Sequence, residues 1–72
     1  MTFANQTYNA VAIYSDNLLV GTVGKRSNKR AKSFTVRVGD VLTWKDQTNA
    51  GVSSSNLGAS YTVACPATTA QF

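Results

Sequence analysis

The chain has no histidine and no glutamate, and its only acidic residues are Asp16, Asp40 and Asp46. General acid-base catalysis near neutral pH uses histidine, or a carboxylate or lysine with a shifted pKa, so the usual groups are nearly absent. A pair between a serine of residues 53–55 and Lys45 is conceivable, but a Gly/Ser-rich segment is far more often only a loop. The sequence therefore predicts a protein that is not an enzyme, uses no cofactor and takes no small-molecule substrate.

The usual supports of a very small fold are also scarce. With 72 residues, the chain buries only about 60 % of the surface that its unfolded form exposes, so a single core gives little stability. One cysteine, Cys65, forms no internal disulfide, and the aspartates sit beside turn residues in a spacing unlike a cation loop. Oligomerisation is the support left by elimination, and a well-packed monomer is the alternative.

Long apolar runs and targeting signals are absent as well. No stretch reaches the ~18 apolar residues that cross a bilayer, and the first residues lack the charge and apolar run of a signal peptide. We expect no membrane partner and a location in the cytoplasm or within a virus particle. The triplet Asn5-Gln6-Thr7 matches the glycosylation pattern, but without an export signal we expect it to be unmodified.

Threonine and valine are abundant, with nine and eight residues, and this composition favours strands over helices. The clearest alternation places Phe34, Val36 and Val38 on one face of a strand. Turn residues at 15–17 and at Gly39-Asp40 predict two tight hairpins, and Gly21 marks a bulge or bend. The predicted strands span residues 7–14, 18–23, 33–38, 41–45 and 60–65.

The predicted fold is all-β: a small five-stranded barrel or sandwich of SH3-like or OB-like size, with antiparallel hairpins, as one domain over residues 1–72. We expect Cys65 to be buried beside Tyr61 and Val63. Loops are predicted at 24–32, which is basic, and at 46–59, which is Gly/Ser-rich. The tail 66–72 is expected to be a frayed end or an arm that docks Phe72 on a neighbour.

Positive charge is concentrated in the basic loop, which we define as residues 24–32. The net charge is +4, and five of the seven cationic residues lie in this loop. Clustered cations among small polar residues suit contact with a phosphate backbone, whereas a loop that only keeps the protein soluble is the plain alternative. The candidate contact residues are Lys25, Arg26, Lys29, Arg30, Lys32 and, on the following strand, Arg37.

Aromatic side chains could extend this surface, because exposed rings stack on bases. Phe34 and Trp44 share faces with aliphatic residues, so we expect them in the core. Tyr8 and Tyr14 are the better candidates for a stacking platform or a subunit contact. Phe72 is a third candidate for such a contact.

Two hypotheses follow. The first is a non-catalytic β module whose basic loop contacts a nucleic-acid backbone without sequence specificity. The second is a homo-oligomeric structural subunit, such as a small component of a virus or phage particle, with the basic loop facing the genome. An inhibitor of a host enzyme would leave no diagnostic trace in the sequence.

Overall fold

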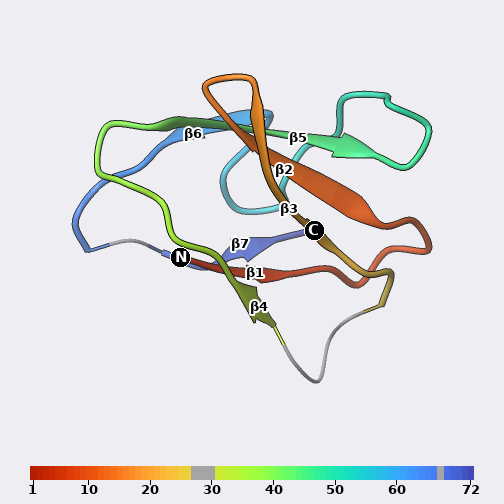
Figure 1. Cartoon of the computed structure of the whole chain (residues 1–72). Coiled ribbons are helices and arrows are strands. Elements are labelled where there is room, and N and C mark those ends of the chain that lie inside the picture. The colour runs from red at the N-terminus through yellow and green to blue at the C-terminus, as the bar shows by residue number, and fades with distance from the viewer. Residues whose placement is uncertain (27–30, 67) are drawn as a thin grey trace.

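The computed structural model describes residues 1–26, 31–66 and 68–72, and these residues are all-β, in two sheets that lie one above the other (Figure 1). None of the described residues forms a helix that is long and apolar enough to span a membrane. The three-stranded sheet has the order β4-β1-β7, with β1 Thr2–Ala4, β4 Lys32–Ser33 and β7 Ala70–Gln71. The four-stranded sheet has the order β3-β2-β5-β6, with β2 Val11–Ser15, β3 Leu18–Val23, β5 Val41–Asp46 and β6 Ser60–Thr62.

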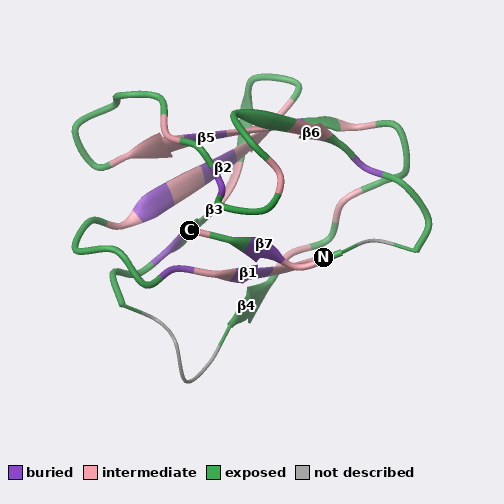
Figure 2. Ribbon diagram, turned by 180° about the vertical axis from the view of Figure 1, so that it is seen from behind, coloured by how far each residue is buried: buried purple, intermediate pink, exposed green. Residues whose placement is uncertain are grey.

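The core lies between the two sheets and is supplied by both. In Figure 2 the buried residues lie on β1 and β7 of one sheet and on β2 and β5 of the other. The ring centroids of Phe3 and Trp44 are 6.3 Å apart, so the two sheets meet through aromatic side chains. The expectation that Trp44 is a core residue is confirmed, and Phe34 packs half-buried against the core. The buried apolar residues are Phe3, Val11, Ile13, Val23, Leu42, Trp44, Val63 and Ala70.

The hairpin expected at residues 15–17 is confirmed as the β2–β3 hairpin. Its two turn residues, Asp16 and Asn17, have φ of 49° and 69°, which is the pattern of a type I′ turn. The register then shifts so that Ile13 faces Gly21, which is the irregularity predicted near this glycine. A Cβ on Gly21 would lie 2.4 Å from the Phe34 ring, so only glycine lets Phe34 pack there.

The strand predicted at 33–38 is wrong apart from Ser33, which belongs to β4. This segment crosses from the three-stranded sheet to the start of β5, so its backbone leaves the ladder (Figure 1). Phe34 and Val36 still point inward, but Val38 is exposed. The hairpin predicted at Gly39-Asp40 is wrong too, because the Gly39 N–H donates to the Val63 carbonyl instead of pairing with 33–38.

Both ends of the chain are ordered in strands that the sequence did not predict. β7 pairs in parallel with β1, and the Phe72 N–H donates to the Ala4 carbonyl at 2.8 Å. The Phe72 ring packs against Trp44 of its own chain, with centroids 5.1 Å apart. The expectation of a frayed end or an outgoing arm is therefore wrong for residues 70–72.

The remaining differences concern strand length and closure. The strand predicted at 60–65 ends at Thr62, and Val63 is its last inward residue, so Cys65 is exposed and its expected burial is wrong. The strand predicted at 7–14 begins only at Val11. The described residues form seven strands where five were expected, and these strands do not close into a barrel.

Candidate nucleic-acid interface

The basic loop connects β3 of the four-stranded sheet to β4 of the three-stranded sheet (Figure 1). Lys25 and Arg26 form a turn directly after β3, and both are exposed. Lys32 lies on β4, and its Nζ donates to the Thr22 carbonyl of β3 at 3.4 Å. The two described ends of the loop are therefore anchored to neighbouring strands. Lys29 and Arg30 lie outside the described residues.

Arg26 lies over the ring of Tyr8. Its guanidinium carbon is 4.9 Å from the ring centroid, a distance at which a cation is attracted to the ring face. Tyr8 nevertheless remains 75 % exposed, so the ring face opposite Arg26 is open to solvent. The structure thus joins a tyrosine and a cation that are 18 residues apart, and Lys25 precedes Arg26 in the same turn.

The segment that carries Tyr8 is held by one buried side chain, Asn5, which is 0 % exposed. Its amide nitrogen donates to the carbonyls of Asn9, Val23 and Gly24 at 2.8, 3.4 and 3.3 Å. Its amide oxygen accepts from the N–H and the hydroxyl of Thr7 at 3.0 and 2.7 Å. We call this arrangement the Asn5 clamp. It ties residues 5–9 to the end of β3, from which Arg26 follows.

This role of Asn5 was not predicted from the sequence. An asparagine side chain tends to accept from the backbone N–H two residues further along the chain, which for Asn5 is the N–H of Thr7. This tendency was the signal in the sequence from which the role could have been predicted. The burial and full bonding of the amide also leave Asn5 inaccessible to a glycosylating enzyme in the folded chain.

The backbone of Arg26 is in the left-handed region, with φ of 51°. For a residue that is not glycine or asparagine, this conformation costs about 1 kcal/mol or more. The Arg26 N–H donates to the Thr7 carbonyl at 2.9 Å, which fixes the strained turn against the Tyr8 segment. The same hydrogen bond therefore helps to set the position of the guanidinium over the ring.

A second tyrosine–cation pair lies on the four-stranded sheet. The Lys45 Nζ is 5.2 Å from the centroid of the Tyr14 ring. Tyr14 and Lys45 are on adjacent strands, opposite Thr43 and Ala12 respectively, and on the side away from buried Ile13 and Trp44. Tyr14 is half-buried, so this ring offers less open surface than Tyr8.

Two predicted site residues lie away from this cluster. Arg37 begins a turn that is closed by a hydrogen bond from the Asp40 N–H to the Arg37 carbonyl. This turn lies next to Val63, whose carbonyl accepts from the Gly39 N–H. This turn and the basic loop occupy different sides of the molecule in Figure 1. Phe72 packs on Trp44, as described above. The structure therefore brings together Tyr8, Lys25 and Arg26, with Lys32 at the other end of the loop.

All three carboxylates accept hydrogen bonds from the backbone, as expected for turn residues. Asp16 accepts from the Val41 N–H at 3.3 Å, and Asp40 from the Arg37 N–H at 2.9 Å. Asp46 accepts from the hydroxyl and the N–H of Thr48, and these bonds hold the pKa of its carboxyl below the ordinary value of 3.8. Each aspartate is thus engaged by a turn or strand start rather than by the basic loop.

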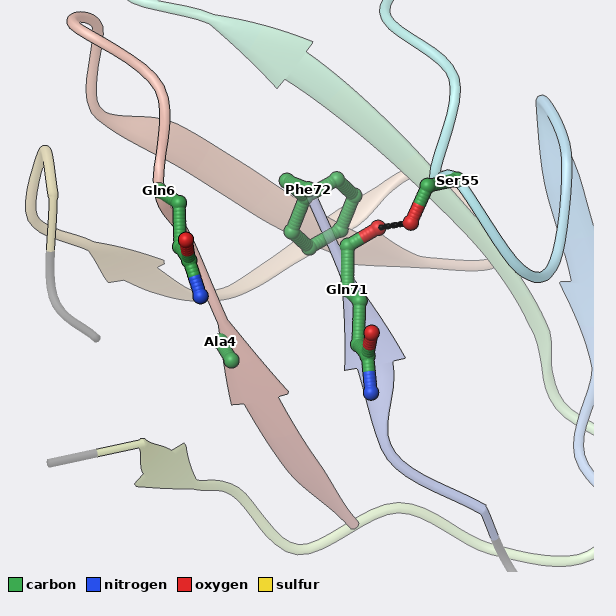
Figure 3. Close-up of a pocket in the computed structure, with 5 residues that line it drawn as sticks. All are labelled: Ala4, Gln6, Ser55, Gln71 and Phe72. Atoms are coloured by element: carbon green, nitrogen blue, oxygen red, sulfur yellow. Dashed lines mark hydrogen bonds between the residues drawn. The ribbon is translucent and has the colours of Figure 1, made fainter. Parts of the chain in front are cut away.

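A surface hollow of about 330 Å³ lies where β1, β7 and the loop around Ser55 meet (Figure 3). The Ser55 hydroxyl donates to the Gln71 carbonyl at 3.0 Å, so its proton is already engaged. The lining side chains are all neutral, and none of them titrates near neutral pH. They are Ala4, Gln6, Ser55, Gln71 and Phe72.

Comparison of the chain with protein-family models, with curated proteins and with solved structures found no match. Its function is therefore argued from the geometry of its own residues.

Proposed function

We propose that the chain is a small, non-catalytic β-sandwich that binds the phosphate backbone of a nucleic acid through the Lys25–Arg26 turn and Lys32. The observation that carries the proposal is the fixed Arg26–Tyr8 pair beside Lys25, on a turn anchored to the Asn5 clamp. Cations held on a rigid turn bind phosphates with a smaller entropic cost than cations on a free loop. The five cations of residues 24–32 in the sequence support the same assignment.

Salt dependence of binding tests the proposal. Each phosphate contact releases counterions, so the affinity for a labelled duplex should fall steeply between low and physiological salt. The double variant Lys25→Ala/Arg26→Ala should bind more weakly and lower the magnitude of the log–log salt slope by about 1.5 to 2.

The matched control is Arg37→Ala/Lys45→Ala, which removes the same charge from the net +4 at positions away from the loop. We expect this control to keep most of the affinity. Equal losses in both double variants would mean that overall charge, rather than this turn, attracts the nucleic acid. Affinity that ignores salt would contradict the proposal itself.

A second function, self-assembly as a structural subunit, is favoured by the free edge of β3. β3 is an edge strand of six residues without charge, and Leu18 and Leu19 at its start are 74 % and 62 % exposed. An uncharged, apolar edge strand pairs readily with another strand. The partner we infer is a second copy, because antiparallel pairing of β3 with itself about a two-fold axis is self-complementary.

The edge formed by β7 gives the contrast. Asn56 donates from its amide to the Thr69 carbonyl at 2.7 Å and accepts from the Gln71 N–H at 3.0 Å. The Ser55 N–H donates to the Gln71 carbonyl at 2.7 Å. Side chain and backbone of one loop thus satisfy the β7 edge. On β3, by contrast, the described side chains bond only the last two residues, Lys32 the Thr22 carbonyl and Asn5 the Val23 carbonyl.

Sedimentation equilibrium tests this second function. We expect a mass above the 7.7 kDa of one chain that returns to that value in the variant Leu18→Lys/Leu19→Lys. Val38→Lys is the control, because it also replaces an exposed apolar side chain but lies outside β3. A mass of one chain for the unmodified protein at high concentration would contradict self-assembly.

A further inference from the structure

The open face of the Tyr8 ring has no role in binding a phosphate backbone. Arg26 covers one face at 4.9 Å, yet three quarters of the residue, 75 %, is accessible. A tyrosine ring buries considerable apolar surface when it stacks, so a ligand that covers the open face gains this burial. A planar, unpaired group is the ligand that fits a single flat ring face.

The ring is also held in place before any ligand arrives. The Asn5 clamp fixes the residues on both sides of Tyr8, since Thr7 and Asn9 are bonded to the same buried amide. The Arg26 N–H to Thr7 carbonyl bond fixes the cation on the same segment. A preorganised ring loses little conformational freedom on stacking, so more of the stacking energy remains as affinity.

Phosphate-binding groups lie directly beside the ring. The Arg26 guanidinium is in contact with the covered face, and Lys25 precedes it in the same turn. One nucleotide presents a flat base and a phosphate, and these two groups match an open ring next to two cations. Aromatic rings interleaved with cations are the usual platform for single-stranded nucleic acids.

We propose that Tyr8, Arg26 and Lys25 form a binding site for one unpaired nucleotide, so that the chain binds single-stranded in preference to double-stranded nucleic acid. The base stacks on the open face of Tyr8, and the adjoining phosphate binds Arg26 and Lys25. A duplex offers only its phosphates, because its base faces are stacked on one another. This inference rests on the proposed function and adds the class of nucleic acid that the site selects.

Asn5 is the positioning residue of this site. It touches neither base nor phosphate, and it acts by holding Tyr8 next to Arg26. The Tyr14–Lys45 pair is the internal comparison, because it also places a cation over a tyrosine ring, with lysine in place of arginine, on a sheet without such a clamp.

The experiment is a fluorescence-anisotropy titration with three labelled DNA probes at one salt concentration. The probes are an oligothymidylate of about ten nucleotides, which lies within the site size of small single-strand binders, a strand of equal length made of abasic sites, and a duplex of equal length. The abasic strand keeps the phosphates and removes the bases. The proteins are the unmodified chain and the variants Tyr8→Ala, Tyr8→Phe and Tyr14→Ala.

We expect Tyr8→Ala to weaken binding of the oligothymidylate about tenfold, in the range known for one stacked base, and to leave binding of the abasic strand and the duplex within about twofold. Tyr8→Phe keeps the ring face and should retain the affinity. Tyr14→Ala should behave as the unmodified chain. Thermal unfolding of each variant, with an unchanged midpoint, confirms that the exposed substitution leaves the fold intact.

The outcomes separate the two proposals. If the unmodified chain binds all three probes equally and Tyr8→Ala changes none of them, the nucleotide site is wrong, while the backbone contact stands. If Tyr8→Ala weakens all three probes equally, the ring only supports Arg26, and the nucleotide site is again wrong. If the chain binds none of the probes, both proposals are overturned.

Discussion

Two polar loops of this protein are held in opposite ways. Residues 5–9 are held chiefly by one fully buried amide, Asn5, which bonds Thr7, Asn9 and the end of β3, with the Arg26 N–H to Thr7 carbonyl bond beside it. Residues 46–58 are held by several side chains in succession, and two of them, Asp46 and Asn56, lie at the surface. The first loop presents an exposed ring, and the second closes a sheet edge and covers the core. A single buried clamp suits a site that must be rigid, while distributed surface contacts suffice for a lid over apolar residues.

The second loop has one buried polar residue of its own, Ser54, which is 4 % exposed. Its hydroxyl oxygen accepts from the N–H groups of Asn56 and Leu57 at 3.3 and 3.1 Å. The Trp44 Nε1–H donates to the Gly58 carbonyl at 2.8 Å and ties the loop to the core. If a buried clamp holds its loop more firmly than surface contacts do, the stability lost on substitution should decrease in the order Asn5, Ser54, Asn56, Asp46.

Asn5→Ala should have the largest effect. It removes the side-chain donor of the Val23 and Gly24 carbonyls and the acceptor of the Thr7 N–H, and unpaired buried groups cost about 1 to 3 kcal/mol, so we expect a loss of about 2 to 3 kcal/mol in the free energy of unfolding. Urea denaturation measures it. Gln6→Ala is the control, because it removes an exposed neighbouring amide and should stay within about 0.5 kcal/mol. Equal effects for both variants would contradict the clamp.

Ser54→Ala should follow with a loss of about 1 to 2 kcal/mol, because it removes the acceptor of two backbone N–H groups inside the loop. Ser53→Ala is the matched control, since Ser53 is exposed. Urea unfolding of both variants gives the difference. A stable Ser54→Ala variant would show that surface contacts alone hold this loop.

Asn56→Ala should cost about 1 kcal/mol, because the lost hydrogen bonds to Thr69 and Gln71 are exposed and water replaces them, and only the bond from the Ser54 hydroxyl is part-buried. It also frees the β7 edge, so association measured by sedimentation should increase. Asn56→Asp keeps the acceptor for the Gln71 N–H, so its stability and its association should lie between those of the unmodified chain and those of Asn56→Ala. Unchanged stability and association would remove Asn56 from the edge-closing role.

Asp46→Asn should have the smallest effect at neutral pH, because the amide oxygen still accepts from the Thr48 and Ala50 N–H groups. The difference appears in acid. The pKa of Asp46 is lowered from 3.8 in the folded chain, so its stabilising contribution is complete above that value and is lost as the pH falls through the folded pKa. Unfolding midpoints between pH 2 and 5 should fall less for the variant than for the unmodified chain. Parallel pH profiles would contradict this assignment.

The local features of the fold were predictable because they depend on neighbouring residues. The Asp16-Asn17 turn follows from two residues that tolerate positive φ between strand-forming runs. Trp44 was expected in the core because it shares a strand face with an aliphatic residue, and it is buried together with Leu42. The segment 33–38 shows where local prediction fails. Its alternation does turn Phe34 and Val36 toward the core, but residues 34–38 form no strand.

The candidate site was predictable only in part. Clustered charge pointed to the loop, and Tyr8 was one of two tyrosines named as candidates for a stacking platform or a subunit contact. The pairing of Tyr8 with Arg26 depends on the Asn5 amide, whose bonds reach 18 and 19 residues along the chain to Val23 and Gly24. Such contacts have no counterpart in local spacing. Arg37 was named as a contact residue on the strand expected after the loop, and the turn at 37–40 carries it elsewhere.

The sequence by itself determined the all-β class, the β2–β3 hairpin, the buried tryptophan and the concentration of charge, because strand propensity, turn chemistry and alternation act between near neighbours. Only the tertiary structure decided that both chain ends join one sheet, that Phe34 requires Gly21, and that Asn5 sets Tyr8 under Arg26. Each of these is a contact between distant segments, and it forms only once packing between the two sheets has brought the segments together.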